Sequence, residues 1–298
     1  VLDQFNQYRA LKASQKNSNS SAQLVDVSNW QPVGPFSHIN TGSWSSGQGR
    51  INAIVKDPLD SNTYYAGAPA GGFWKSTDGG LTWVTSTDDL PQIGVSGIAV
   101  DASNTNIIYI ATGDDDAGDS FSVGVMKSID GGLTWNVTGL NPNNFPAIDS
   151  MNDIYINPSN PNMLWVATNR GVYRSTDAGT SWTVGAGTSN INIRDIKVKP
   201  NDPSVIYAAS SNRFYRSTNS GASFTQIFGG LPFNGVSRYV IDVTPADPNL
   251  VYLLSADNSY EFGSIYRSTN SGVNFSVVAN QAISGDIFQS TQSWYDLA

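Results

Sequence analysis

The chain contains one dense cluster of possible metal ligands, the acidic stretch Asp114-Asp115-Asp116-Ala117-Gly118-Asp119. Calcium in proteins takes several oxygen ligands, and carboxylates on a backbone that bends at a glycine can supply them. We therefore expect Asp114, Asp116 and Asp119 to be the first ligands of a Ca²⁺ ion. The alternative is a solvated acidic loop, because the stretch lacks the rest of an EF-hand loop.

Two further acids, Asp153 and Asp195, are the candidates for catalysis. They stand at equivalent positions, at the start of an apolar run, in two consecutive repeats of the chain. Glycoside hydrolases use a pair of carboxyl groups that flank the scissile bond. If both side chains face a central channel, they form such a pair. The alternative is that each carboxylate caps the end of its strand.

Other catalytic machinery is missing from the sequence. Cysteine is absent, which excludes disulfides, zinc–thiolate sites and a cysteine nucleophile. His38 is the only histidine, and no nucleophile-elbow motif accompanies it, so a Ser-His-Asp triad is not expected. No P-loop motif for nucleotide phosphates is present either.

Arginine and aromatic residues are the candidates for ligand binding. Arg194 and Arg238 stand near the starts of apolar runs, and Trp44, Phe145 and Tyr260 stand in expected loops. Aromatic rings can stack on sugars, and guanidinium groups can hold carboxylates. We predict a ligand site that includes Arg194, Arg238, Trp44 and Tyr260. The alternative for Trp44 and Phe145 is that they cover the rim of the core.

These residues belong to a chain in which one octet occurs five times. Each copy follows an apolar run and ends on Trp or Phe, a pattern typical of a strand, a tight turn and a second strand. Asp or Asn at the third position can bond back to the turn, and Gly at the fifth supplies a positive φ. We expect the closing aromatic residue to be buried between neighbouring sheets. The copies are STDGGLTW at 76–83, SIDGGLTW at 128–135, STDAGTSW at 175–182, STNSGASF at 217–224 and STNSGVNF at 268–275.

From residue 49 onward a unit of four expected strands repeats, with octets at intervals of 42 to 52 residues. Each unit has an apolar run, a turn rich in Asp, Asn, Ser and Pro, a second apolar run, and the octet hairpin. Four short strands per unit are the signature of a β-propeller. Because the first two runs are almost entirely apolar, we expect them to be packed on both faces. The sequence therefore predicts an all-β propeller with five complete blades.

The two ends of the chain do not fit these blades. Residues 1–22 predict a short helix and a polar linker, and residues 23–298 predict the propeller. The segment Trp30–Pro35 resembles the strand that follows an octet, so we interpret it as a fourth strand without its blade. Residues 295–298 resemble the start of another first strand. We expect the propeller to be incomplete at the C-terminus and to belong to a ring of roughly six to eight blades.

The octet pattern S-x-D-x-G-x-T-W resembles the Asp-box, or BNR, repeat of propellers, which occurs in sialidases, sortilin-like receptors, xyloglucan hydrolases and a photosystem assembly factor. Residues 49–83 and 109–135 also resemble the propeller of large secreted proteins of Gram-negative bacteria that leave the cell by the type IX route. This resemblance implies a secreted or cell-surface location and further domains in the same polypeptide. It implies no chemistry for the octets, because such turns lie at the outer edge of a propeller.

The resemblance also argues against catalysis. Xyloglucan hydrolases place a catalytic Asp in the first blade, just before a Gly-Gly-aromatic segment. The matching stretch at 66–73 has Pro69 and no acid. A sialidase needs a set of arginines with a Tyr and a Glu, but Glu261 is the only glutamate and no FRIP-like motif is present.

Composition and charge narrow the possible partners. The net charge of −8 argues against nucleic acid and anionic membranes, and no apolar run is long enough to span a bilayer. We expect a non-catalytic propeller module that binds a glycan or a protein, or acts as a scaffold. The alternative is an enzyme, a polysaccharide hydrolase (glycosidase) that uses paired Asp carboxylates.

Overall fold

The computed structural model describes residues 50–90, 94–114, 120–288 and 293. The chain forms two compact units, Val1–Gln48 and Gly49–Ala298, and all described residues belong to the second. The expected N-terminal helix and linker, the segment Trp30–Pro35 and the last residues lie outside the described ranges. Within those ranges, no helix has the length and hydrophobicity that a membrane span requires.

The described part of the second unit is built from antiparallel four-stranded sheets, each made of strands consecutive in sequence. The first sheet contains β1 (Ala53–Lys56), β2 (Tyr64–Ala68), β3 (Gly72–Ser76) and β4 (Val84–Thr85). The second contains β5 (Val95–Val100), β6 (Ile108–Thr112), β7 (Val125–Ser128) and β8 (Asn136–Val137). The third contains β9 (Met151–Ile156), β10 (Leu164–Thr168), β11 (Gly171–Ser175) and β12 (Thr183–Val184).

Two more sheets follow in the same order of strands. The fourth contains β13 (Ile193–Val198), β14 (Ile206–Ser210), β15 (Phe214–Ser217) and β16 (Thr225–Ile227). The fifth contains β17 (Arg238–Val243), β18 (Val251–Ala256), β19 (Phe262–Ser268) and β20 (Ser276–Asn280). The short helix α2 (Gln281–Ser284) comes directly after β20.

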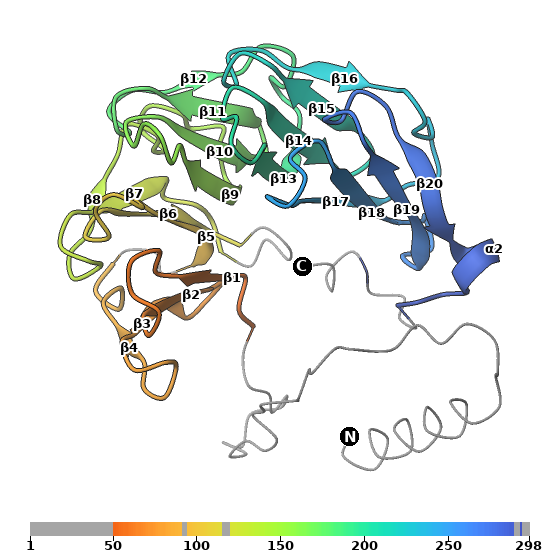
Figure 1. The fold of residues 1–298 in the computed structure, drawn as a ribbon. Helices are drawn as coiled ribbons and strands as arrows, with labels where there is room; N and C mark the ends of the chain where they lie inside the picture. Colours follow the sequence, from red (N-terminus) through yellow and green to blue (C-terminus); the bar gives the residue numbers. More distant parts are fainter. Residues whose placement is uncertain (1–49, 91–93, 115–119, 289–292, 294–298) are drawn as a thin grey trace, which may run out of the picture. The chain divides into compact units, whose positions relative to one another are not determined.

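The five sheets follow one another in space as they do in sequence (Figure 1). The first strands are neighbours, since β1 contacts β5, β5 contacts β9, β9 contacts β13 and β13 contacts β17. In each sheet the first strand lies on the inner side and the fourth on the outer side (Figure 1). This is how propeller blades are arranged, so the expected all-β propeller with four-stranded blades is confirmed. The number of blades in a complete ring stays a prediction.

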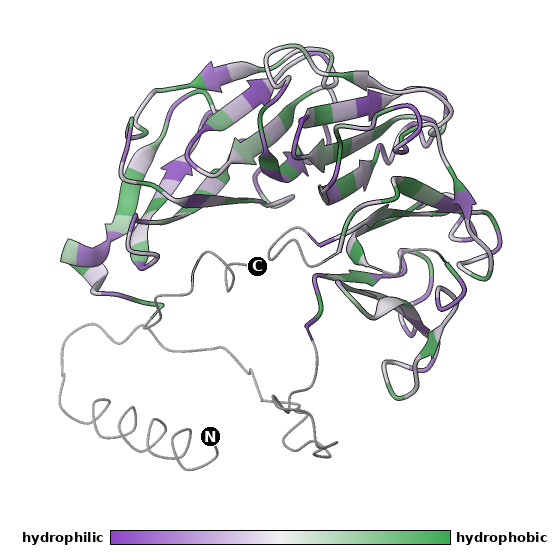
Figure 2. Ribbon diagram, turned by 180° about the vertical axis from the view of Figure 1, so that it is seen from behind, coloured by the Kyte–Doolittle hydropathy of each residue, from purple (hydrophilic) through white to green (hydrophobic). Residues whose placement is uncertain are grey.

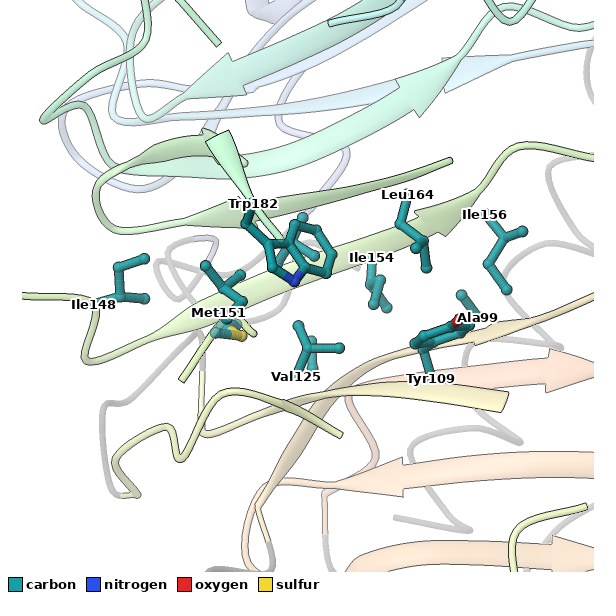
Figure 3. Packing of buried hydrophobic residues seen from close by; sticks show 12 residues of the cluster. Ala99, Tyr109, Val125, Ile148, Met151, Ile154, Ile156, Leu164 and Trp182 are labelled. Atoms are coloured by element: carbon teal, nitrogen blue, oxygen red, sulfur yellow. The ribbon is translucent and has the colours of Figure 1, made fainter. Parts of the chain in front are cut away.

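Large apolar side chains fill the space between neighbouring sheets. Between the second and third sheets, Tyr109, Leu164 and Trp182 pack in one buried cluster (Figure 3). Each fully buried side chain of this size contributes about 1.5–3 kcal/mol. The strands β6, β10 and β14 are buried along their whole length, as expected for strands packed on both faces. Along many strands, hydrophilic residues alternate with hydrophobic residues (Figure 2).

Each octet folds into a turn that its own polar side chains close. In the first copy, Ser76 Oγ accepts a hydrogen bond from the Gly80 N–H (2.9 Å) and donates one to Asp78 Oδ1 (2.8 Å). Asp78 also accepts hydrogen bonds from the Thr82 N–H (2.9 Å) and the Thr82 hydroxyl (2.6 Å). The last two copies use asparagine at the same position. The expected role of the third octet position is therefore confirmed.

The aromatic residue that closes an octet packs on the preceding sheet. Trp135 lies edge-on to Phe73 with ring centroids 4.9 Å apart, and Phe275 lies edge-on to Phe214 at 5.0 Å. Trp83 is 37 % exposed, because the described residues contain no sheet before the first one. The expected burial of this residue therefore depends on a preceding sheet.

The octet turns also accept hydrogen bonds from the preceding sheet. Lys75 Nζ donates to the carbonyl of Gly131 (3.0 Å), and Trp165 Nε1 donates to the carbonyl of Ser220 (2.9 Å). Side chains of one sheet thus occupy backbone acceptors in the turn of the next. Packing and hydrogen bonding together fix the position of each sheet relative to its neighbour.

The octet backbone has positive φ at two consecutive positions, the fourth and the fifth, where the sequence pointed to the fifth alone. The fourth position is not glycine in three copies, where Ala178, Ser220 and Ser271 have φ of 56°, 56° and 57°. A side chain in this left-handed region costs about 1–2 kcal/mol. The hydrogen bonds within the octet must offset that cost.

Two substitutions separate backbone strain from close packing in these turns. A Cβ on Gly79 meets nothing within 4 Å, so the only cost of Gly79→Ala is the positive φ of 77°. We expect this variant to lower the free energy of unfolding by about 1 kcal/mol. A Cβ on Gly221 would lie 2.7 Å from Trp165 Nε1, so Gly221→Ala also creates a steric clash with the preceding sheet. We expect this variant to lower the free energy of unfolding by more than about 2 kcal/mol. Urea unfolding measures both losses. Equal losses would show that the turn does not depend on contact with the preceding sheet.

The octet aspartates should make stability fall in acid. Hydrogen bonds from Thr82 and Ser76 lower the pKa of Asp78 to about 2, and similar bonds lower the pKa values of Asp130 and Asp177. Each carboxylate therefore stabilises the fold above its ordinary pKa of 3.8, and this contribution is lost as the pH falls toward 2.

The matched variant is Asp78→Asn/Asp130→Asn/Asp177→Asn, which installs the residue that the last two octets already have. Its melting temperature should fall less steeply between pH 4 and pH 2 than that of the unmodified protein. Thermal unfolding followed by circular dichroism at intermediate pH values measures this. Identical slopes for the two proteins would rule out the aspartates as the source.

Candidate functional site

The first strands of all five sheets line one cavity of about 600 Å³. This volume lies in the range of about 300–1,000 Å³ that is common for ligand pockets. Backbone and apolar side chains form most of the wall, and charged groups gather where β9, β13 and β17 meet. The charged lining residues are Arg50, Asp153, Arg194, Asp195, Lys197 and Arg238.

A β-bulge comes directly before each of the two expected catalytic acids. The register of β9 with β10 shifts at Asn152, immediately before Asp153. The register of β13 with β14 shifts at Arg194, immediately before Asp195. Bulges bend a strand and re-aim its side chains, and they are frequent beside active sites. The structure thus places both acids at equivalent points of consecutive sheets, on the same cavity.

Lys197 connects the two acids. Its Nζ lies 2.5 Å from Asp195 Oδ1 and 3.4 Å from Asp153 Oδ2, and it lies 5.7 Å from the centroid of the Tyr155 ring. Residues two apart on a strand point to the same face of the sheet. The side chains of Asp195 and Lys197 therefore lie on one face of β13, and those of Asp153 and Tyr155 lie on one face of β9. We call these four residues the Lys197 cluster.

The two carboxyl groups of the cluster have different surroundings. Desolvation raises the pKa of Asp153 to about 6, although the charge of Lys197 opposes this shift. Asp195 Oδ2 accepts a second hydrogen bond, from the Ile241 N–H of β17 at 2.6 Å. The cluster therefore contains one carboxyl that keeps its proton in weak acid and one that accepts hydrogen bonds from both Lys197 and Ile241.

The cation of the cluster remains charged. Burial alone would lower the pKa of Lys197, but the charges of Asp153 and Asp195 raise it above its usual value. The three side chains are 11–25 % exposed, and an ion pair that is largely withdrawn from water is stable only when additional hydrogen bonds compensate for desolvation. Lys197 and Asp195 meet this condition through contacts to β9 and β17, so the cluster cross-links three sheets.

The structure brings two of the four expected ligand-binding residues to the cavity. Arg194 and Arg238 line it together with the acids. Tyr260 lies in the turn between β18 and β19, 43 % exposed and outside the cavity lining. Trp44 lies outside the described residues. Phe145 packs against the core, which fits its alternative role as a cover of the rim.

The expected calcium ligands are only partly described. Asp114 is buried and forms an ion pair with Arg50, and Asn52 Nδ2 lies 3.5 Å from its Oδ1. Asp116 and Asp119 lie outside the described residues. Among the residues that are described, no three His, Cys, Asp or Glu side chains are grouped to hold a metal ion. Calcium binding at this loop stays a prediction.

The sequence interpretation did not include Lys197, Tyr155 or Arg50. The first two carry a pattern that would have identified them, because each follows a candidate acid by two residues in an expected strand. Arg50 has no such pattern. Its partner Asp114 comes after the second strand of the next sheet, and only the packing of the first two sheets brings them together.

Comparison with known proteins points to enzymes that act on polysaccharides. A xyloglucanase of Paenibacillus sp is 24 % identical over 177 residues, which cover 56 % of this chain and 17 % of that protein. Xyloglucanase Xgh74A of Acetivibrio thermocellus is 29 % identical over 148 residues, which cover 46 % and 18 %. Among solved structures, an ancestral GH74 enzyme matches with a TM-score of 0.63 and 21 % identity, over 77 % of this chain and 31 % of that one. No protein-family model matches the chain.

These similarities correct the expected function. The chain spans less than a fifth of the length of the curated relatives that it matches. Both relatives are xyloglucanases, so the expectation of a non-catalytic binding or scaffold module is wrong, and the glycoside hydrolase is the better supported alternative. The solved structure supports the propeller fold independently of function.

The unequal environments of the two acids can be tested by titration. A ¹³C NMR titration should give Asp153 a midpoint near 6. Lys197→Met removes the opposing charge and should raise that midpoint further. Because the folded pKa exceeds the ordinary value of 3.8, the Asp153 contribution to stability should fall as the pH rises from about 4 to about 6. The asparagine of Asp153→Asn cannot ionise, so the stability of this variant should not show this decrease between pH 4 and pH 6. A midpoint near 4 in the unmodified protein would contradict the assignment.

Proposed function

We propose that this chain is part of a polysaccharide hydrolase, a glycosidase whose acid–base pair is Asp153 and Asp195. One observation carries the proposal: a single cavity contains two carboxyl groups that share one ammonium partner. Burial raises the pKa of one of these groups, Asp153, as a general acid requires. The similarity to xyloglucanases supports the same class of reaction.

We propose a different role for each carboxyl group. Asp153 is the general acid, since it keeps its proton in weak acid and can donate it to the glycosidic oxygen as the C–O bond breaks. Asp195 is the anion that stabilises positive charge on the sugar ring and accepts a proton from the attacking water. Asp195 accepts hydrogen bonds from Lys197 Nζ and from the Ile241 N–H. The reaction consumes one water and creates one reducing end.

We propose a xyloglucan-type polysaccharide as the substrate. The names of the relatives support this choice, and Arg194 and Arg238 line the cavity. Because such a polymer does not cross a membrane, the enzyme acts outside the cell. The low share of charged residues, 13 %, suits the polar uncharged surface of a secreted β protein.

We also assign the octets to the Asp-box class of repeats. The support is their common set of hydrogen bonds from Ser and Asp or Asn, and their position beside the outer strands. They take no part in the chemistry. The resemblance to type IX proteins of Gram-negative bacteria remains the basis for proposing that route of export.

The proposal predicts hydrolysis that depends on both acids. Incubation with xyloglucan should produce new reducing ends, and Asp153→Asn or Asp195→Asn should each lower the rate at least ~100-fold. The rate of the unmodified protein should fall as the pH rises through about 6, because Asp153 then loses the proton that it must donate.

Asp247→Asn is the matched control, because Asp247 is an exposed acid in a turn, outside the cavity lining. It should leave the rate unchanged. Melting temperatures verify that all variants are folded. Hydrolysis that survives in both cavity variants would rule out this acid pair. The absence of new reducing ends with any polysaccharide would rule out the function for this chain.

A further inference from the structure

The loop between β16 and β17 exposes two aromatic rings beside each other. Phe228 and Phe233 are 54 % and 83 % exposed. Their ring centroids are 5.8 Å apart, and the ring planes are inclined by 30°. Single exposed apolar side chains are common on protein surfaces, but adjoining aromatic rings at the mouth of a pocket indicate a binding surface.

The backbone that carries these rings is held in place. The Phe275 N–H donates to the carbonyl of Gly229 (2.9 Å), and the Leu231 N–H donates to that of Phe228 (3.2 Å). Gly230 has a φ of 75°, and a Cβ there would lie 1.8 Å from the Phe275 carbonyl oxygen. Leu231 packs against the core. The rings are therefore presented by an anchored loop, which reduces the entropy that binding would lose.

A pocket of about 260 Å³ lies beside the rings. Its polar lining comes from Asn212 and Arg213, in the turn between β14 and β15, and from Gln226 of β16. No acidic residue lines it, although the chain has a net charge of −8. The pocket thus combines flat apolar surfaces with amide and guanidinium groups.

We propose that this pocket, the Phe228–Phe233 subsite, binds a pyranose ring of a glycan. One face of a pyranose carries C–H groups and can pack on an aromatic ring, while the hydroxyls at its edge bond to amides and guanidinium groups. The volume is close to the lower end, about 300 Å³, of ordinary ligand pockets. Two phenylalanine rings bury at most ~500 Å², well below the ~1,000 Å² of a stable protein interface.

The inference rests on the proposed function only for its class of ligand. Tyr239 lines both the subsite and the central cavity, but neither Asp153 nor Asp195 lines the subsite. Binding at the subsite and hydrolysis in the cavity can therefore fail separately.

The test measures binding to the whole chain in an Asp153→Asn background, which prevents turnover. Isothermal titration uses two probes, neutral xyloglucan oligosaccharides and oligogalacturonate, which separate a neutral pyranose from an acidic one held by Arg213. Phe228→Ala/Phe233→Ala should weaken binding of at least one probe about tenfold. The control Leu81→Ala/Leu133→Ala removes two similarly exposed apolar side chains from octet turns and should not change binding.

The outcomes separate the two proposals. Binding that the phenylalanine variant loses and the leucine control keeps supports the subsite, even if the unmodified protein releases no reducing ends. Equal affinities for the phenylalanine variant and its background would overturn the subsite, and so would the absence of binding to both probes. In a further outcome, the unmodified protein hydrolyses the polysaccharide while the phenylalanine variant binds the probes as its background does. That result would support the proposed function and overturn the subsite.

Discussion

The structure depends on the contact between each octet turn and the sheet before it. Ser and Asp or Asn side chains satisfy the N–H groups inside the turn, so its carbonyl groups remain available to donors from the preceding sheet. Trp165 and Arg216 are two such donors. The aromatic residue that closes the octet packs on the same sheet. Because the second to fifth units each repeat this contact, the first strands are held around one cavity.

The charged groups in that cavity are not explained by stability. Replacing a buried ion pair by apolar side chains of similar volume is often neutral or stabilising. The Lys197 cluster nevertheless joins β9, β13 and β17 through charged side chains and one backbone N–H. A carboxyl with a raised pKa in a cavity, such as Asp153, is an arrangement that serves proton transfer. This arrangement supports the acid–base role that we propose for the cluster.

The candidate sites lie where the repeats differ from one another. The octets are nearly alike in all five sheets and serve to join them. At the position of Asp153 and Asp195, the second sheet has Gly97, where a Cβ would lie only 3.2 Å from atoms of Ile154. The loop with Phe228 and its partner ring occurs between the fourth and fifth sheets. A regular scaffold thus presents a few irregular residues, and these carry the proposed chemistry and binding.

The sequence by itself determined the features that depend on neighbouring residues. Octet hydrogen bonds, strand alternation and the spacing of repeats are local, so the propeller and the equivalent positions of Asp153 and Asp195 could be predicted. Only the tertiary structure placed Lys197 between the two acids and supplied the Ile241 N–H. The physical reason is that desolvation, charge and packing around a side chain come from adjacent sheets, whose residues are distant in sequence.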